Sequence, residues 1–332
     1  MNLVALFSDI AAQHGAKSAI LENGKIVSYQ ELWNSIERLA AAFYRIGIRD
    51  HNRVALILPN SSEFIYCFFA LLKNNAIVCP LNPDMTPYEL KNITNNLDPH
   101  VIISINTLID KVVNESPSLL EQKILILQGR SSQILQANKY YELDDLLKEN
   151  TQACDIQGEE ESTVTINYTY RGLGYPLGAM LSHENYAKGI SGYIDRTGMH
   201  GDHTVLSLLP LYHVFPLLGC MLAPLFCGAT IVISRNYLPR AVLKIIDDYK
   251  INYLTMVPLI YKLLLRYYKK GDYNLSSLTC CITGGDYVAA SFQKEIYDKL
   301  GIALLQGYGL TECLPVICNP PVHNKFGTLG TS

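Results

Sequence analysis

Two short stretches of the sequence combine glycine with residue types that can bind phosphate. The first, Tyr168–Gly178, reads Tyr-Thr-Tyr-Arg-Gly-Leu-Gly-Tyr-Pro-Leu-Gly; it follows a β-prone run at 162–167 and precedes a predicted helix start at Ser182. Because glycine lets backbone N–H groups approach an anion closely, a strand, such a loop and a helix can form a phosphate cradle. An ordinary turn is the alternative, since the stretch matches neither the Walker pattern nor the dinucleotide fingerprint.

The second stretch, Gln306–Glu312, reads Gln-Gly-Tyr-Gly-Leu-Thr-Glu and begins at the end of a predicted strand. Ligands of open α/β sheets bind outside the carboxyl ends of the strands. At such a place the Thr311 hydroxyl can donate to a phosphate, and the Glu312 carboxylate can hold Mg²⁺. Tyr308 offers a flat face on which a base can stack. A helix cap formed by threonine and glutamate is the alternative.

Together the two stretches resemble the adenylate-forming superfamily, which comprises acyl-CoA synthetases, aryl-CoA ligases, luciferases and the adenylation domains of peptide synthetases. The family's phosphate loop reads Tyr-Thr-Ser-Gly-Thr-Thr-Gly-x-Pro-Lys-Gly. This chain departs from it at positions 170–173 and at the family's lysine, which is Leu177 here. The second stretch matches the family's Tyr-Gly-x-Thr-Glu without departure. The loop positions that are kept are Tyr168, Thr169, Gly174, Pro176 and Gly178.

The resemblance implies roles for the residues of the second stretch. In the family the threonine contacts the nucleotide phosphate and the glutamate helps to bind the metal, so these roles pass to Thr311 and Glu312. Tyr308 and Gly309 would contact the adenine on one side. Gly284-Gly285-Asp286 resembles the family's Gly-Gly-Ala/Glu turn and would contact the adenine on the other side, where a larger side chain would block a planar ligand.

The first stretch is expected to hold the nucleotide phosphates, although it lacks the family's lysine. One hypothesis is that Arg171 replaces the lost charge, because its planar fork suits phosphate oxygens. The rival hypothesis is that the altered loop handles ATP poorly. The residues of this loop expected to contact the nucleotide are Thr169, Gly172, Gly174 and Gly178.

Leu209–Phe215 resembles the family's Pro-Leu-Phe-His segment, whose histidine lies between the acyl pocket and the thiol tunnel. His213 is therefore expected to contact the carboxylate or to gate the thiol, with a satisfied core histidine as the alternative. Thr255-Met256-Val257-Pro258 resembles the family's Thr-x-Val-Pro segment. This segment would form part of a mostly apolar wall that contacts the organic tail of the acid.

Composition limits the class of protein. The chain has 332 residues, 49% hydrophobic and 17% charged, which supports a buried core and roughly two domains or one large domain with subdomains. The net charge is −3 and no basic block occurs. Nucleic acid is therefore excluded as a main partner, because binding to its phosphate backbone needs clustered Lys and Arg.

Nine cysteines occur without a Cys-x-x-Cys pair, which predicts reduced thiols in a cytoplasmic protein and argues against a zinc site. The N-terminus has no basic region before Asp9 and does not resemble a signal peptide. Residues 203–234 carry no Asp, Glu, Lys or Arg. Prolines and glycines interrupt this run, so we expect buried strands around a short helix and no transmembrane segment.

Repeated β-α alternation predicts an α/β fold, with parallel-rich sheets flanked by helices in two subdomains. We place the subdomains at residues 1–160 and 161–332, with a polar junction near residues 128–163. Strands are expected at 18–21, 25–28, 54–58, 77–80, 101–105, 124–127, 162–167, 205–209, 230–233, 253–256, 279–283 and 303–305. Helices are expected at 3–13, 28–46, 63–73, 86–97, between 105 and 124, from 182, near 214–226, and at 239–249, 258–268 and 289–300.

The resemblance implies that the protein converts a fatty or other apolar carboxylic acid with ATP and Mg²⁺ to acyl-AMP, and then to a thioester of coenzyme A. Two alternatives are a non-catalytic adenylation-fold protein that binds an acyl ligand or a partner, and an acyl carrier protein ligase. Residues 327–332 resemble a segment of the family that is followed by a ribose-binding aspartate, a hinge and a small C-terminal domain. This chain offers no candidate for these three parts. The acid and the oligomeric state stay open, with a dimer as one possibility.

Overall fold

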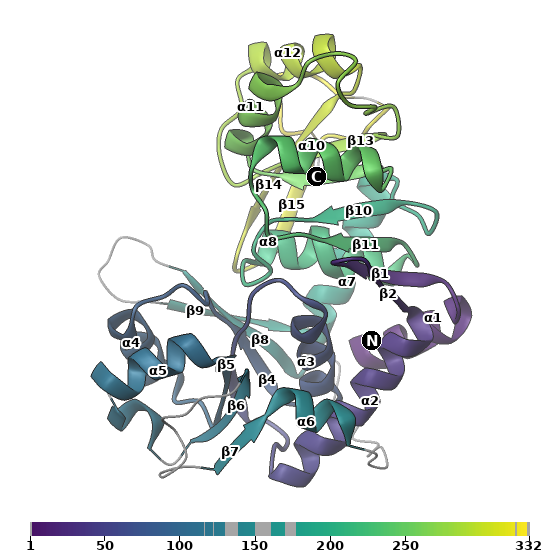
Figure 1. Ribbon diagram of the computed structural model, residues 1–332. Coiled ribbons are helices and arrows are strands. Elements are labelled where there is room, and N and C mark those ends of the chain that lie inside the picture. The colour runs from purple at the N-terminus through teal and green to yellow at the C-terminus, as the bar shows by residue number, and fades with distance from the viewer. Residues whose placement is uncertain are drawn as a thin grey trace. The chain divides into compact units, whose positions relative to one another are not determined.

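The computed structural model describes residues 2–115, 117–121, 123–129, 139–149, 161–169, 177–322 and 324–330 (Figure 1). The chain divides into two compact units. The first contains Met1–Ser8 and Gln30–Glu184, and the second contains Asp9–Tyr29 and Asn185–Ser332. This division differs from the expected boundary after residue 160, because the strand pair that flanks the phosphate-loop stretch belongs to the first unit.

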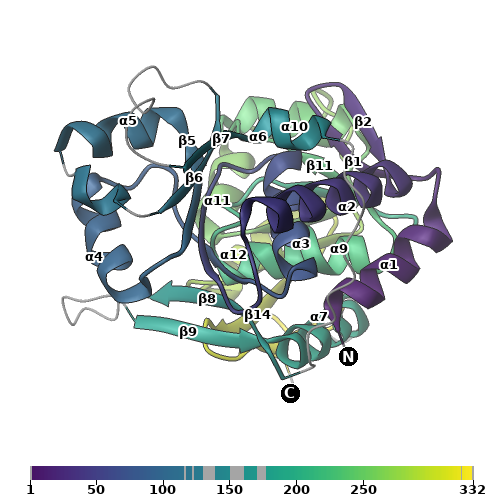
Figure 2. The same cartoon turned by 90° about the horizontal axis from the view of Figure 1, so that it is seen from below.

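The first unit is built on a seven-stranded sheet with the order β7-β6-β5-β3-β4-β8-β9. All neighbouring strands run parallel except β8 and β9, which lie side by side as an antiparallel pair (Figure 2). The strands are β3 (Arg53–Ile57), β4 (Ile77–Pro80), β5 (Val101–Ile105), β6 (Ile124–Gln128), β7 (Lys139–Glu142), β8 (Thr163–Thr169) and β9 (Leu177–Ser182).

Helices cover both faces of this sheet, which explains why its central strands are apolar along their whole length. α4 (Pro87–Leu97) and α5 (Asn106–Glu115) lie on one side and α3 (Ser62–Lys73) on the other (Figures 1 and 2). α3 is buried along nearly its whole length and contacts α2 (Tyr29–Ile46), where Asn74 Nδ2 donates to the Ala40 carbonyl at 2.9 Å. The unit also contains the 3₁₀ turn Pro117–Leu120 and α6 (Leu143–Lys148).

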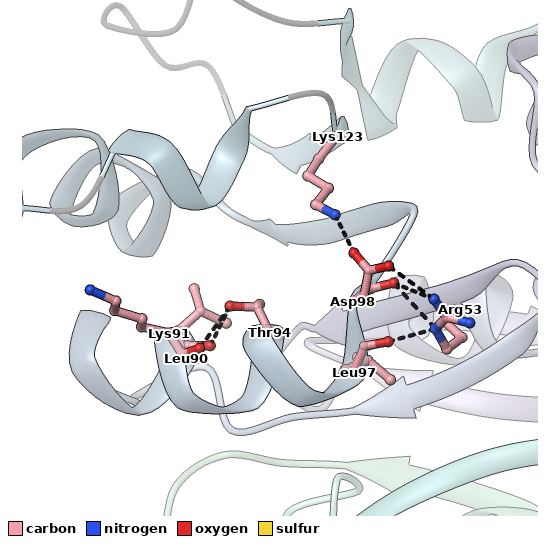
Figure 3. A network of polar contacts seen from close by, with 7 residues as sticks. All are labelled: Arg53, Leu90, Lys91, Thr94, Leu97, Asp98 and Lys123. Atoms are coloured by element: carbon pink, nitrogen blue, oxygen red, sulfur yellow. Dashed lines mark hydrogen bonds and ion pairs between the residues drawn. The ribbon is translucent and has the colours of Figure 1, made fainter.

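The end of α4 is fixed by two basic side chains, Arg53 of β3 and Lys123 directly before β6 (Figure 3). Asp98 caps the helix in the left-handed conformation, with φ of 44°. Its carboxylate accepts hydrogen bonds from Lys123 Nζ at 2.9 Å and from Arg53 Nη2 at 3.2 Å. The hydrogen bond from Lys123 lowers the pKa of Asp98. This contact joins α4 to the beginnings of β3 and β6.

The second unit is built on an eight-stranded sheet with the order β15-β14-β13-β12-β10-β11-β1-β2. The pairs β1–β2 and β14–β15 are antiparallel, and the other neighbours are parallel. The strands are β1 (Ser18–Glu22), β2 (Lys25–Ser28), β10 (Thr204–Ser207), β11 (Thr230–Ile233), β12 (Tyr253–Met256), β13 (Cys280–Thr283), β14 (Leu304–Leu310) and β15 (Leu314–Cys318).

Each face of this sheet has its own helices. One face packs against α10 (Pro239–Asp248), α11 (Pro258–Tyr267) and α12 (Ala290–Leu300), with Leu254 and Met256 in the shared core. Thr255, between them on β12, points to the opposite face. There it meets α7 (His183–Thr197) and the π-helical turn η2 (Leu217–Leu222), which lies between α8 (Val214–Pro216) and α9 (Ala223–Phe226).

The structure confirms most expected elements and corrects three expectations. β7 and α6 lie inside the stretch that we interpreted as a polar junction. The phosphate-loop stretch leads into a strand, β9, and the expected helix begins only at His183. Gly307, Tyr308 and Gly309 lie beyond the strand that we expected at 303–305, yet they are part of β14, because their backbone pairs with β15. In the described ranges, no helix combines the length and hydropathy that a membrane span requires.

Candidate active site

The Gln306–Glu312 stretch forms the end of β14 and part of the turn of a β-hairpin at one edge of the second unit's sheet. Gly307, Tyr308 and Gly309 lie in β14, opposite β15, and Thr311–Cys313 form the turn. Leu314, the first residue of β15, has φ of 65°, which is rare for a branched side chain. It is buried and packs into a notch on α7, where a Cβ added to Gly189 would lie 2.7 Å from Leu314 Cδ1. This contact fixes the hairpin turn against α7.

A cavity of about 410 Å³ opens between this hairpin, α7, α8 and the strand ends of the sheet. Its wall is mainly apolar, and its polar groups come from the hairpin turn, from His213 and from backbone. The lining residues are Tyr193, Leu209, Pro210, His213, Val214, Phe215, Pro216, Val257, Ile282, Gly284, Gly285, Gly307, Tyr308, Gly309, Leu310, Thr311, Leu314, Ile317 and Cys318. The cavity therefore lies outside the carboxyl ends of parallel strands, where open α/β sheets bind ligands.

Gly284 and Gly285 follow β13 and form one wall of the cavity. A Cβ added to Gly284 would lie 3.3 Å from Phe215 Cζ and 3.4 Å from the Gly307 carbonyl oxygen, so this backbone packs tightly on both neighbours. Gly285 has φ of 79°, a conformation that favours glycine. A planar ligand can therefore approach this backbone more closely than side chains would allow. Asp286 is exposed and its Oδ1 accepts from the Tyr287 N–H at 2.7 Å, so it does not line the cavity.

Tyr308, Thr311 and Glu312 lie at the open side of the cavity. The Tyr308 side chain is 46% exposed, although it stands in a strand, so its ring is accessible to a ligand. Thr311 lines the cavity and is half-buried. Glu312 is the next residue in the turn and is exposed to solvent. The hairpin thus presents an aromatic face, a hydroxyl and a carboxylate within five consecutive residues.

His213 lines the same cavity and caps the start of α8. Its ring lies 4.5 Å from the Tyr212 ring, centroid to centroid. Surrounding atoms desolvate the imidazolium, which lowers the pKa of His213, while part of the side chain keeps access to solvent. A neutral imidazole beside an apolar wall can accept or donate a hydrogen bond near neutral pH.

The phosphate-loop residues belong to the first unit. Thr169 ends β8 and pairs with Leu177, and Tyr168 pairs with Gly178. Tyr168 donates from its hydroxyl to Asn96 Oδ1 of α4 at 2.7 Å. A Cβ added to Gly178 would lie 2.6 Å from Ile166 Cγ2, so cross-strand packing alone explains this glycine.

Two sets of predicted residues are therefore held on separate units. Gly284, Gly285, His213, Tyr308, Gly309 and Thr311 share the cavity of the second unit. Thr169 and Gly178 lie on the β8–β9 hairpin of the first unit. The predicted residues Arg171, Gly172 and Gly174 lie outside the described residues.

Sequence reasoning missed several residues of the cavity wall, among them Tyr193 and Leu314. A tyrosine on a helix is most simply interpreted as core, and Leu314 shows no sign of its left-handed backbone in the sequence. Cys318 also lines the cavity, and burial raises the pKa of its thiol to about 11, so it is not an activated nucleophile. Among the described residues, no three His, Cys, Asp or Glu side chains gather into a group that could bind a metal ion.

Comparison with known proteins identifies relatives of the whole chain. The sequence pattern of the AMP-binding enzymes matches residues 7–332. The chain is 27% identical over 342 residues to a probable CoA ligase, CCL5, of Humulus lupulus. This alignment covers 98% of this chain and 61% of that protein. The chain is 26% identical over 356 residues to a long-chain-fatty-acid–CoA ligase of Bacillus subtilis (strain 168), covering 99% of this chain and 63% of that protein. The chain thus spans about three fifths of the length of these curated relatives.

Solved structures share the fold. The anthranilate CoA ligase AuaEII in complex with anthranoyl-AMP superposes with a TM-score of 0.91 at 20% identity, covering 99% of this chain and 64% of that one. ATP-bound MatB from Rhodopseudomonas palustris superposes with a TM-score of 0.87 at 24% identity, again covering 99% and 64%. At these identities the comparison establishes the fold alone.

Proposed function

Since the chain belongs to the family of AMP-binding enzymes, we propose that it carries the active site of an ATP-dependent ligase that activates a carboxylic acid. In the first step the carboxylate attacks the α-phosphorus of ATP, the bond to the β-phosphate oxygen breaks, and acyl-AMP and pyrophosphate form. In the second step the thiol of coenzyme A attacks the acyl carbon, AMP leaves, and the thiol proton passes to solvent or a base. The relatives that match over nearly the whole chain are named as CoA ligases, which supports this assignment.

The observation that carries the proposal is the cavity at the strand ends. One part of its wall is the glycine backbone at 284–285 together with Tyr308, which suits a planar base. The adjoining part is apolar and includes Val214, Phe215 and Val257, which suits the organic part of an acid. A base site and an apolar site that share one cavity are what an acyl-adenylate requires. The apolar wall supports a fatty or other apolar acid as the substrate.

The hairpin turn supplies groups for the phosphates. We assign the Thr311 hydroxyl to a phosphate oxygen and the Glu312 carboxylate to Mg²⁺. Because magnesium usually takes one or two protein carboxylates and completes its shell with water and substrate phosphates, a single exposed glutamate fits this ion. When bound, the ion would neutralise the charge that develops on the phosphates.

Catalysis of the first step then depends on position and charge. The cavity excludes water from one side of the acyl group and aligns the carboxylate with the phosphate. Thr311 is assigned to stabilise a phosphate oxygen as the bond breaks. In the second step His213, whose pKa is lowered by desolvation, is assigned to the mouth of the cavity, where a neutral ring can orient the thiol.

One observation favours a second candidate function. The family's lysine is replaced by Leu177, and bulky residues occupy loop positions 170 and 171. A non-catalytic protein of the same fold, which binds an acyl ligand or a partner, would tolerate these changes. A ligase for an acyl carrier protein differs only in the thiol it accepts.

The described cysteines have unpaired thiols, which suits a cytoplasmic protein. Our proposal therefore includes a cytoplasmic location.

Calorimetric titration of the chain with ATP, with and without Mg²⁺, tests the proposal. We expect saturable binding that Glu312→Gln weakens at least about tenfold when Mg²⁺ is present. The difference should vanish in EDTA, because the carboxylate acts through the metal. The matched control is Glu295→Gln, another exposed glutamate of the second unit, which pairs with Lys299 at 2.7 Å. Absence of binding at millimolar ATP, or equal weakening by both variants, would refute the assignment.

A further inference from the structure

Tyr193 of α7 forms a part of the cavity wall to which the proposed chemistry assigns no role. Its side chain lines the cavity, yet only 6% of the residue is exposed. Its hydroxyl lies 2.9 Å from Thr255 Oγ1, on a residue of β12 that is fully buried. The hydroxyl is therefore held in the core, and we infer that the ring is the part of Tyr193 that faces the cavity.

The tip of Tyr193 is packed against the π-helical turn η2. A Cβ added to Gly219 would lie 2.7 Å from the Tyr193 hydroxyl oxygen and 3.2 Å from Thr255 Cγ2. The space between η2 and this hydroxyl is therefore smaller than a methyl group. All six residues of η2 are buried, and one of them, Cys220, directs its Sγ toward the Thr255 carbonyl oxygen at 3.8 Å. Helix α7, strand β12 and η2 thus meet at the Tyr193 hydroxyl.

A ligand could pass this point only if the ring moved. Rotation of the side chain about its Cα–Cβ bond would break the hydrogen bond between Tyr193 and Thr255 and leave a buried hydroxyl without its partner. It would also need space that η2 occupies, because Gly219 already approaches as closely as a residue can. The cavity, at about 410 Å³, is near the lower end of the range for small-molecule pockets and must also hold the nucleotide end of an acyl-adenylate.

We propose that Tyr193, fixed by Thr255 and Gly219, closes the inner end of the acyl site, so that the cavity accepts compact acyl groups and rejects long alkyl chains. The substrate class is then an aryl or medium-length alkyl carboxylate. Tyr193 is a specificity-determining residue, which sets the length of the acyl group and takes no part in the reaction itself. This inference rests on the proposed function, because it assumes that the apolar part of the cavity holds the acyl group.

The test measures binding, so that it needs no turnover by the chain. Three stable mimics of acyl-AMP are titrated calorimetrically: the benzoyl, octanoyl and hexadecanoyl forms of 5′-O-(N-acylsulfamoyl)adenosine. We expect the benzoyl and octanoyl compounds to bind and the hexadecanoyl compound to bind at least about tenfold more weakly than the octanoyl compound.

A variant then identifies the residue responsible. Tyr193→Leu removes the ring from the wall, so we expect the hexadecanoyl compound to gain at least about tenfold in affinity relative to the benzoyl compound. The matched control is Tyr253→Leu. Tyr253 is also buried and also joins β12 to α7, because its hydroxyl donates to the Thr197 carbonyl at 2.7 Å, but it does not line the cavity. The control should leave the preference for acyl length unchanged.

The outcomes separate the two proposals. Equal or tighter binding of the hexadecanoyl compound by the unmodified chain overturns the inference, even if Tyr193→Leu fails to fold. A length preference that Tyr193→Leu leaves unchanged overturns it as well. If neither Mg-ATP nor any of the three mimics binds, it is the proposed function that fails.

Discussion

His183 provides a stability test that can be worked out from the structure. It is the first residue of α7 and directly follows the β8–β9 hairpin. The residue is 1% exposed, and its Nδ1 accepts a hydrogen bond from the Leu3 backbone N–H at 3.2 Å. Only the neutral ring offers an acceptor at this nitrogen, because both nitrogens of the imidazolium carry a proton. Burial lowers the pKa of His183 from 6.5 to about 4.

The sign and size of the pH effect follow from these two pKa values. Between pH 6.5 and pH 4 the unfolded chain binds a proton at this position that the folded unit does not bind. The contribution of His183 to the free energy of unfolding is therefore complete above about pH 7 and decreases as the pH falls toward 4. Since one pKa unit corresponds to about 1.4 kcal/mol, the loss between about pH 7.5 and pH 5 is about 2 kcal/mol at most.

The measurement is urea unfolding of the chain at these two pH values, followed by tryptophan fluorescence. Trp33 is the only tryptophan, and it lies in the same unit as His183, 6.2 Å from the Phe7 ring. His183→Asn keeps a side-chain acceptor and cannot titrate in this range, so its stability should depend less on pH than that of the unmodified chain, by about 1–2 kcal/mol. His51→Asn, a change at an exposed histidine of the same unit, is the control.

If the unmodified chain and His183→Asn lose the same stability between the two pH values, the reasoning is refuted. The ring would then bind its proton in the folded unit as readily as in the unfolded chain. A pH effect removed equally by His51→Asn would also contradict it, because the effect would not belong to the buried ring.

Two further changes test the candidate site and its support. Tyr308→Ala should weaken binding of Mg-ATP by about 1–3 kcal/mol, the range of a base-on-aromatic contact, whereas Tyr308→Phe should keep the affinity. If calorimetry finds equal losses of affinity for both variants, the effect belongs to the hydroxyl and not to the ring. Gly228→Ala should destabilise the second unit by about 2 kcal/mol or more, because Gly228 has φ of 78° and an added Cβ would lie 2.2 Å from His14 Nε2. Gly24→Ala, with φ of 79° and nothing within 4 Å, should have the smaller effect in thermal unfolding; equal shifts in Tm would show that the contact with His14 adds nothing.

Much of the fold could be predicted because local and tertiary preferences agree. Asn23 and Gly24, between the strands that we expected at 18–21 and 25–28, have φ of 48° and 79°, which is the left-handed pair that a two-residue hairpin turn requires. Thr86 and Glu89 form a reciprocal capping box at the start of α4, as their spacing permits. The central strands of both sheets are continuous apolar runs between helices, which is the pattern of buried parallel strands.

The predictions failed where pairing between strands overrides local preference. Gly307 and Gly309 favour a turn, yet their backbone pairs with β15 and both lie in a strand. Leu177–Ser182 carries two small residues and the exposed Met180, so its own pattern is weak, and antiparallel pairing with β8 makes it a strand. Neither partner can be deduced from the segment itself.

The candidate site was predictable to the extent that its chemistry is encoded in consecutive residues. The hairpin turn with Thr311 and Glu312 and the glycines at 284–285 are short motifs, so all four of these residues can be found without a structure. The wall at Tyr193 is different, because Thr255 and Gly219, which fix this tyrosine, come from two other segments of the chain. Their meeting point depends on how closely η2 approaches the sheet, and no local pattern encodes that distance.

The order of strands in the second unit has a consequence for how the chain folds during synthesis. Ile20 of β1 pairs with Ile231 of β11, 211 residues later in the chain, so the ribosome must synthesise residues 1–231 before these partners can meet. Such long-range pairing slows folding. A fragment that began at residue 185 would lack β1 and β2 and would expose β11 as an open sheet edge, which promotes association between copies. The first 28 residues are therefore needed to complete the sheet that carries the candidate site, and an expression design that removes them would remove its edge.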